Sequence, residues 1–239
     1  MHRPFYSIVI PIFNESENLR PLAQGIIGVM ESIGEEFELI FVDDGSLDQT
    51  VEILRNLNQE DPRVCYLRLD ANSGQSTALW AGLKEARGQV IITMDGDLQN
   101  DPQDIPLLLK NLEDCDVVTG WRQKRRDPWL KRVSTRVANF VRDMVTMEQI
   151  RDTGCGFKAF RRHCLEAVVP FDGLHRFLPT LFRMRGYRVK EVPVSHHPRR
   201  HGVSKYNIRN RLFRGILDLL GVRWLKKRRI SYQVVERAG

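Results

Sequence analysis

The sequence predicts an α/β fold in which helices cover both faces of a mostly parallel sheet. Short apolar runs rich in β-branched residues alternate with helix-length segments along the first half of the chain. Strands separated by helices pair in parallel, because the chain crosses over the sheet between them. With 239 residues, of which 42% are hydrophobic, the chain can bury a substantial core. This composition excludes a disordered chain, a collagen-like fibre and a disulfide-rich miniprotein.

Each element follows from a local pattern. The run YSIVIPIF at 6–13 has the β-branched residues that favour strands, and a helix-length segment at 16–33 separates it from the apolar run FELIFV at 37–42. The same alternation then repeats. The remaining predicted elements are a helix at 48–60, a strand at 64–69, a helix at 74–87, a strand at 90–94 and two strands near 116–120 and 187–194.

The end of the chain has a different pattern. From Ile208 it reads IRNRLFRGILDLLGVRWLKKRRI, in which apolar residues recur at helical spacing with arginines between them. We therefore expect one domain at 1–206 and a basic amphipathic helical segment at 207–239. Two interpretations of this segment stay open. It either packs on the core as a terminal helix, or it lies on an anionic membrane surface with its apolar face down.

The net charge of +7 is unevenly distributed. Residues 1–119 hold 8 basic and 21 acidic residues, a net −13, whereas residues 120–239 hold 29 and 9, a net +20. A basic half of this kind indicates a nucleic acid, an anionic membrane or a phosphate-bearing substrate as partner. No helix-turn-helix, zinc finger or aromatic RNA-binding platform is recognisable, so we do not expect nucleic acid. We recognise neither a secretory signal nor an apolar run of membrane-spanning length. The four cysteines show no CxxC pair and no zinc-finger spacing, so we expect them to be reduced in a cytosolic compartment.

Polar residues follow four of the predicted strands at the point where each strand ends. These clusters are Asn14–Glu15, Asp43–Ser46, Asp70–Gln75 and Asp95–Gln99. In open parallel sheets, ligands bind beyond the carboxyl ends of the strands. A single Asp after a strand is usually a helix cap or a turn residue, but four polar clusters at one sheet edge indicate a binding site.

The segment Asp95-Gly96-Asp97 is the clearest metal-binding candidate. Side chains at positions i and i+2 of an extended segment point the same way, so both carboxylates can face one ion. Oxygen ligands suit a hard cation, Mg²⁺ or Mn²⁺, which takes phosphate oxygens and water as its remaining ligands. A diphosphate would fit such a site, although an acidic triplet alone is a weak signal.

Together these segments resemble the family 2 glycosyltransferases, which have the GT-A fold. The resemblance covers about residues 5–206 and rests on SIVIPIFNESENL, FVDDGSLDQT, RLDANSGQSTAL, MDGDLQNDP, TGWR and DTGCGFKAFRR. Within the family the chain looks most like the polyprenyl-phosphate sugar synthases of the dolichol-phosphate mannose synthase type, because MDGDLQNDP is close to their DADLQHPP and HGVSKY to their GxSKY. The resemblance implies a metal-dependent, inverting enzyme on the cytoplasmic face of a membrane. It would transfer a sugar from GDP-mannose or a UDP-sugar to a polyprenyl phosphate.

The resemblance also implies a donor site. The residues that it assigns to the nucleotide-sugar are Pro11, Phe13, Glu15, Val42, Asp43, Asp44, Asn72, Gly74, Asp95, Gly96, Asp97, Arg199 and Lys205. Phe13 stands where the family usually has Tyr, which keeps the ring and loses a hydroxyl. The metal ion, Mg²⁺ or Mn²⁺, is expected on Asp95, Asp97 and Gln99.

On the acceptor side, the resemblance assigns the phosphate of the polyprenyl phosphate to Arg122, with Arg136 as a second ligand. Asp97, Arg122 and Asp152 are the candidate catalytic residues. Three roles of Asp152 stay open: a general base, a positioning group, or a cap of the following turn. The alternative function is transfer to a hydroxyl of a glycan or a lipid-linked saccharide in cell-envelope polysaccharide synthesis. That reaction would require a carboxylate base.

Overall fold

The computed structural model describes residues 4–122, 150–199, 208–228 and 236. The chain divides into two compact units. The first comprises Met1–Pro128 and Ile150–Ser204, and the second comprises Trp129–Gln149 and Lys205–Gly239.

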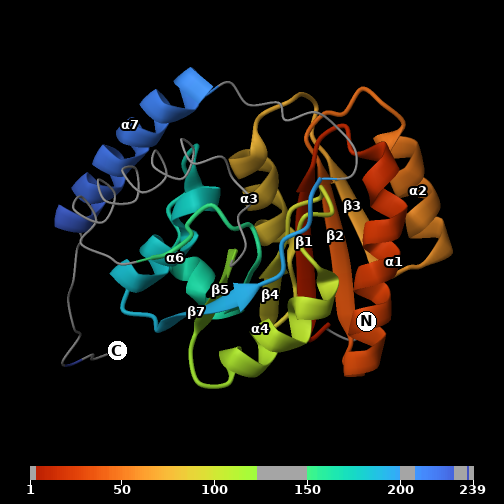
Figure 1. Cartoon of the computed structure of the whole chain (residues 1–239), viewed down its shortest axis with the longest axis horizontal. Helices are drawn as coiled ribbons and strands as arrows, with labels where there is room; N and C mark the ends of the chain where they lie inside the picture. Colours follow the sequence, from red (N-terminus) through yellow and green to blue (C-terminus); the bar gives the residue numbers. More distant parts are fainter. Residues whose placement is uncertain (1–3, 123–149, 200–207, 229–235, 237–239) are drawn as a thin grey trace. The chain divides into compact units, whose positions relative to one another are not determined.

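The first unit is built on a seven-stranded sheet with the strand order β3-β2-β1-β4-β6-β5-β7 (Figure 1). The strands are β1 (Tyr6–Ile12), β2 (Phe37–Asp43), β3 (Val64–Arg68), β4 (Val90–Thr93), β5 (Val117–Arg122), β6 (Lys158–Arg161) and β7 (Val189–Val194). All neighbouring strands pair in parallel except those at β6, which runs antiparallel to both β4 and β5. The predicted, mostly parallel sheet is therefore confirmed, with β6 as an additional strand.

Helices cover both faces of this sheet. They are α1 (Ser16–Ile33), α2 (Thr50–Glu60), α3 (Gln75–Glu85), α4 (Ile105–Leu112) and α6 (Leu174–Met184), with short 3₁₀ turns η1 (Pro102–Asp104) and η2 (Arg162–Ala167). The three predicted helices are confirmed as α1, α2 and α3. The helices α4 and α6 were not predicted from the sequence.

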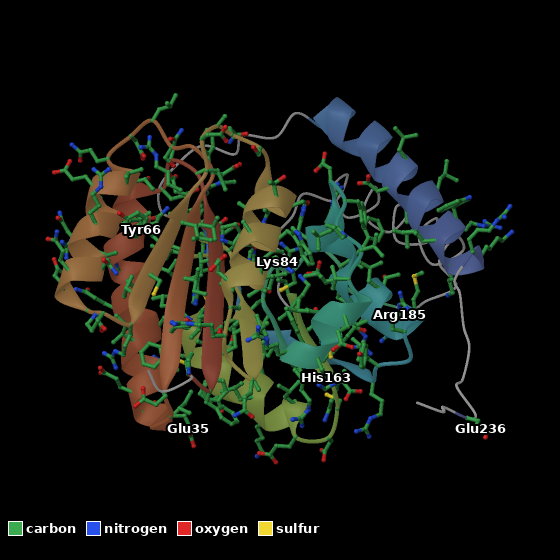
Figure 2. All side chains as sticks on the ribbon, turned by 180° about the vertical axis from the view of Figure 1, so that it is seen from behind. Glu35, Tyr66, Lys84, His163, Arg185 and Glu236 are labelled. Carbon is green, nitrogen blue, oxygen red and sulfur yellow. The ribbon has the colours of Figure 1, made fainter. Side chains whose placement is uncertain are left out.

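Two apolar clusters form the core, one on each face of the sheet. On one face, Ile8 and Ile10 of β1 pack with residues of α1, α2 and α4. On the other face, Val9 of the same strand packs with residues of α3 and α6. Side chains fill the layers beside the sheet, and exposed charged residues such as Glu35 and Lys84 lie on the outside of the unit (Figure 2). This alternation along β1 follows from the pleat of a strand whose two faces are both covered.

Strand β6 contains only four residues, KAFR. Ala159 and Phe160 are buried, and the ring of Phe160 lies 5.0 Å from that of Phe182 on α6. Because β6 runs against its neighbours, its first residue, Lys158, lies at the edge where the parallel strands end. A short antiparallel strand thus brings a lysine to the carboxyl edge of the sheet.

In the second unit, α7 (Ile208–Lys227) confirms the predicted C-terminal helix. At 100° per residue, Leu217, Leu220 and Trp224 share one side of α7, and their exposed fractions are 52%, 54% and 61%. Arg223 and Lys226 project on the same side as other apolar residues, so apolar and basic side chains are only partly separated. No helix in the described part of the chain is long and apolar enough to cross a membrane.

Candidate active site

The topology brings the predicted site residues of the first unit to one edge of the sheet. Strands β1, β2, β4, β5 and β7 all end at this edge, and the antiparallel β6 begins there. The last residue of β5, Arg122, lies at this edge, and the loops that meet there carry Glu15, Asp44, Asp95 and Arg199. Segments far apart in the sequence thus converge at one edge, and their roles in binding stay predictions.

Asp95 is held in place by three neighbours, two of which contact its carboxylate. Gln75 at the start of α3 donates from Nε2 to Asp95 Oδ1 at 3.0 Å, and the Asp95 backbone N–H donates to Asn100 Oδ1 at 3.3 Å. The backbone of Gly156 lies against the carboxylate, since a Cβ there would be 2.4 Å from both carboxylate oxygens. Only glycine permits this close approach.

Asp95 and Asp97 form an oxygen-rich cluster. Burial, and then repulsion from Asp97, raises the pKa of Asp95 to about 6, although Lys158 and Arg122 oppose the shift. Asp97 accepts from the Gln99 backbone N–H at 3.2 Å, which sets the turn between them. Among the described residues, no three His, Cys, Asp or Glu side chains gather into a metal site. Two neighbouring carboxylates can bind a cation that takes its other ligands from a substrate.

Arg122 and Asp152 form a nearly buried ion pair beside this cluster. Arg122 donates from Nε to Asp152 Oδ2 at 2.7 Å and from Nη2 to Asp152 Oδ1 at 2.8 Å. Their side chains are 18% and 10% exposed, respectively. The bidentate geometry fixes the guanidinium plane and occupies both carboxylate oxygens of Asp152.

Lys158 adds a second buried cation. Its side chain is 2% exposed, and Nζ donates to the backbone carbonyl of Cys155. Burial lowers the pKa of Lys158, while attraction to Asp95 and Asp152 is among the effects that oppose the shift. A buried ammonium beside two carboxylates is a strong electrostatic feature, and the sequence analysis missed it.

Asp43 and Asp44, at the end of β2, are both buried. Asp44 accepts from the backbone N–H groups of Ser73 at 2.7 Å and Gly74 at 2.9 Å, so it joins the end of β2 to the start of α3. Asp43 accepts from the Ser46 backbone N–H at 3.1 Å. In the structure both carboxylates hold the loops of the expected donor site, and direct contact with a nucleotide stays a prediction.

The segment after β7 contacts the loops that follow β4 and β1 at this edge. The backbone N–H of Ser195 donates to Asp104 at 2.6 Å, and His197 lies 2.9 Å from Asp101 through Nε2. Arg199 then forms an ion pair with Glu15, which also accepts from Asn18 at 2.6 Å. Residues 195–199, which we call the strap, therefore link the loop after β4 to the loop after β1.

The other predicted site residues differ in their exposure. Pro11, Phe13 and Gly74 are partly exposed at the edge, and Asn72 is exposed. Val42 is fully buried in the core cluster beside α3, so its side chain does not face the edge. Gly96 packs against β1, since a Cβ there would be 2.6 Å from a methyl carbon of Ile12. Gln99 is partly exposed. Arg136 and Lys205 lie outside the described residues.

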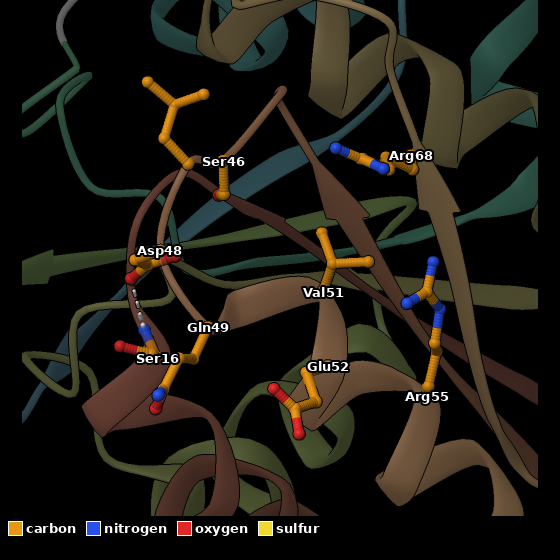
Figure 3. Close-up of a pocket in the computed structure, with 9 residues that line it drawn as sticks. Ser16, Ser46, Asp48, Gln49, Val51, Glu52, Arg55 and Arg68 are labelled. Carbon is orange, nitrogen blue, oxygen red and sulfur yellow. Dashed lines mark hydrogen bonds between the residues drawn. The ribbon is translucent and has the colours of Figure 1, made fainter.

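A pocket of about 710 Å³ opens beside the loop that follows β2 (Figure 3). Arg55 of α2 and Arg68 of β3 line one part of it, and Ser16 and Asp48 line another, joined by a hydrogen bond of 3.3 Å from the Ser16 backbone N–H. Arg68 Nε lies 3.7 Å from Asp43 Oδ2. The pocket thus adjoins the Asp43 end of the edge, and Asp95 and Arg122 are not part of its lining.

Sequence reasoning missed three contributors to the site. Gln75 holds Asp95 through a hydrogen bond, and Lys158 interacts electrostatically with Asp95. The third contributor is Asp104, which anchors the strap. Gln75 lies inside one of the polar clusters, so its position was a usable signal. Lys158 lies inside the segment DTGCGFKAFRR, but its burial was not expected, because lysine is normally an exposed residue.

Comparison with known proteins gives consistent findings. The model of the family described as "Glycosyl transferase family 2" matches residues 7–169. The dodecaprenyl-phosphate galacturonate synthase of Rhizobium johnstonii is 41% identical over 222 residues, covering 90% of this chain and 65% of the relative. The undecaprenyl-phosphate 4-deoxy-4-formamido-L-arabinose transferase of Edwardsiella ictaluri is 37% identical over 206 residues, covering 85% and 63%. The chain therefore spans slightly less than two thirds of the length of these curated relatives.

Solved structures share the fold. The glucosyl-3-phosphoglycerate synthase of Mycobacterium tuberculosis, in complex with Mn²⁺, UDP and glucosyl-3-phosphoglycerate, has a TM-score of 0.68 at 20% identity, covering 93% of this chain and 80% of that chain. A mannosyltransferase from Pyrobaculum calidifontis, in complex with GDP-mannose and Mn²⁺, has a TM-score of 0.64 at 20% identity, covering 97% and 66%. These likenesses confirm the predicted GT-A fold.

Proposed function

Since the chain belongs to glycosyl transferase family 2, we propose that it transfers a sugar from a nucleotide-diphospho-sugar to a polyprenyl phosphate, giving a polyprenyl-phosphate-linked monosaccharide. The names of the two curated relatives support this acceptor class, since both contain a polyprenyl phosphate. The observation that carries the proposal is the meeting of an acidic and a basic group at one sheet edge. Asp95 and Asp97 suit the donor side, and Arg122 suits a phosphate-bearing acceptor.

On the donor side, Asp95 and Asp97, with Gln99 beside them, would hold Mg²⁺ or Mn²⁺. The structural neighbours solved with Mn²⁺ or Mg²⁺ support a divalent cation of this kind. When bound, the ion supplies positive charge to the diphosphate that departs. Arg199, carried by the strap, would add a guanidinium to the same diphosphate after leaving Glu15. The nucleotide base, guanine or uracil, is left open by these residues.

On the acceptor side, Arg122 would orient the phosphate for attack on the anomeric carbon, with inversion in a single displacement. A phosphate monoester has a second pKa of about 6, so its oxygen is already ionised at neutral pH and needs no general base. The geometry agrees, because both oxygens of Asp152 accept hydrogen bonds from Arg122. We therefore favour the positioning role for Asp152 over the roles of base and cap.

The proposed acceptor is a membrane lipid, so we also propose that α7 lies on the anionic cytoplasmic face of a membrane. Three exposed apolar residues on one side of α7 would enter the headgroup region, and Arg223 and Lys227 are exposed for contact with lipid phosphates. Each basic residue near such a surface contributes about 1 kcal/mol.

The test of the proposed function incubates the protein with labelled UDP- and GDP-sugars, Mg²⁺ or Mn²⁺, and polyprenyl phosphate. Label should enter the lipid phase with one donor. Asp97→Asn, which removes one charge of the metal pair, should lower transfer by about a hundredfold or more, because charge stabilisation of the transition state is lost. Asp114→Asn, at an exposed position away from the edge, is the matched control.

Two results would redirect the assignment. Label that enters a glycan or lipid-linked saccharide, with none on polyprenyl phosphate, would establish the alternative function in cell-envelope polysaccharide synthesis. Full transfer by Asp97→Asn would remove the metal role of Asp97.

A further inference from the structure

Lys158 is the one fully buried lysine in the described part of the chain. It begins β6, which pairs with β5, the strand that carries the proposed acceptor ligand Arg122. In register Lys158 pairs with Thr93 of β4 and Thr119 of β5. Thr93 precedes Asp95 by two residues, and Thr119 precedes Arg122 by three. The register therefore places the start of β6 between the strand that carries Asp95 and the strand that carries Arg122.

The loop that leads into Lys158 is fitted around charged groups. A Cβ on Gly154 would be 3.1 Å from Arg122 Nη2, and a Cβ on Gly156 would be 2.4 Å from the Asp95 carboxylate oxygens. Thr93 Oγ1 donates to the carbonyl of Gly156 at 2.7 Å, and Lys158 Nζ donates to the carbonyl of Cys155. The hydrogen bond from Lys158 thus holds this loop through the Cys155 carbonyl, and its ammonium interacts electrostatically with Asp95, Asp152 and Arg122.

Lys158 reduces the excess of negative charge at this point, where the carboxylates of Asp95, Asp97 and Asp152 outnumber the cations of Arg122 and Lys158. The charged groups that interact with Lys158 are Asp95, Asp152 and Arg122. Asp152 neutralises Arg122 through the bidentate pair, so Arg122 alone leaves no net positive charge for an incoming phosphate. Asp95 would repel that phosphate, and Lys158 is the buried cation that offsets this repulsion.

We propose that Lys158 is a positioning residue for the acceptor: its buried ammonium offsets Asp95 and Asp152, which allows Arg122 to attract an acceptor phosphate. The proposal rests on the proposed function, and it assigns Lys158 an electrostatic role in addition to its hydrogen bond. Loss of the charge should weaken acceptor use and leave donor binding nearly unchanged.

The experiment separates the charge of Lys158 from its hydrogen bond. Lys158→Gln removes the charge and keeps a donor for the Cys155 carbonyl. The KM for polyprenyl phosphate should rise about tenfold or more, because an unbalanced buried carboxylate is left near the acceptor. The donor Kd, measured by calorimetry with Mn²⁺, should stay within about threefold of the parent value. This limit is well below a tenfold change, which corresponds to about 1.4 kcal/mol of binding free energy. Lys190→Gln, at an exposed position in β7, is the matched control.

A double variant tests the charge balance directly. In Lys158→Gln with Asp152→Asn, one positive and one negative charge are removed together, so the acceptor KM should return toward the parent value. Independent losses that multiply in the double variant would overturn the proposal. An unchanged acceptor KM in Lys158→Gln would overturn it as well.

The remaining outcomes are also distinguishable. If Lys158→Gln does not fold, the double variant is compared with Asp152→Asn alone. A further tenfold rise in acceptor KM in that background would contradict the charge-balance role, and an equal or lower KM would support it. Absence of any transfer to polyprenyl phosphate by the parent protein would instead refute the proposed function.

Discussion

At the scale of single residues, the backbone of Gly156 lies against the carboxylate of Asp95 and thereby fixes the geometry of the candidate metal site. Gly156 contacts both carboxylate oxygens of Asp95, and Gln75 fixes one of them from the other side. The carboxylate is thereby clamped between a backbone and a side chain. A rigid ligand of this kind keeps its geometry before a substrate arrives, which favours electrostatic catalysis.

Gly156→Ala should disturb this clamp. The added Cβ would lie 2.4 Å from each carboxylate oxygen, so Asp95 must move. We expect a loss of about 1–3 kcal/mol in the free energy of unfolding, as for other overpacked sites. Mn²⁺ affinity in the presence of nucleotide should fall as well. Urea unfolding and calorimetry measure the two effects.

Gly28→Ala is the control for that substitution. Gly28 lies inside α1 with no neighbour within 4 Å of an added Cβ, so alanine should leave metal affinity unchanged. It should raise the free energy of unfolding by up to about 1 kcal/mol through helix propensity. Unchanged Mn²⁺ affinity in Gly156→Ala would show that the clamp is unnecessary.

At the scale of elements, the sequence was most informative where a pattern is local. The strands β1, β2, β3 and β4 and their polar ends were predictable, because an apolar run followed by Asp, Asn or Gly is visible within a few residues. The pairing of Arg122 with Asp152 was not predictable, since it joins residues 30 positions apart. Strand β6 was also missed, because four residues beginning with lysine do not show a strand pattern. Its direction, and the placement of Lys158, depend on tertiary structure.

The strap depends on similar long-range contacts, and its anchor can be tested. Asp104→Ala removes the acceptor of the Ser195 backbone N–H, a bond of 2.6 Å. We expect a loss of about 1–3 kcal/mol in the free energy of unfolding, because a hydrogen bond to a charged group is lost. Since the strap carries Arg199, the KM for the nucleotide-sugar should also rise severalfold, with a smaller change in kcat.

Asp114→Ala is the matched control for the strap variant, because Asp114 is exposed after α4. It should alter neither stability nor donor KM. If Asp104→Ala loses stability while the donor KM stays at the parent value, the strap supports the fold and does not contribute to donor binding.

At the scale of the whole molecule, the charge distribution agrees with a proposed donor site in the acidic first half and a proposed acceptor site in the basic second half. The acidic first half supplies Asp95 and Asp97, whereas Arg122, Lys158 and α7 belong to the basic second half. A donor held through a cation and an acceptor held through its own phosphate need these opposite environments. The net charge of +20 in residues 120–239 also favours association with an anionic bilayer over a neutral one.

We expect the whole chain to cosediment with vesicles containing anionic lipid at low salt and to be released at high salt, because exposed charges are screened at a Debye length of about 3 Å in 1 M salt.

Leu217→Ser combined with Trp224→Ser removes two of the three exposed apolar residues on one side of α7 and should reduce binding at every salt concentration. Leu47→Ser, at a position 91% exposed in the first unit, is the control and should bind like the parent chain. If the α7 variant sediments as the parent does, a surface other than this side of α7 makes the contact. If neither variant nor parent binds anionic vesicles, the proposed association of α7 with a membrane surface is refuted.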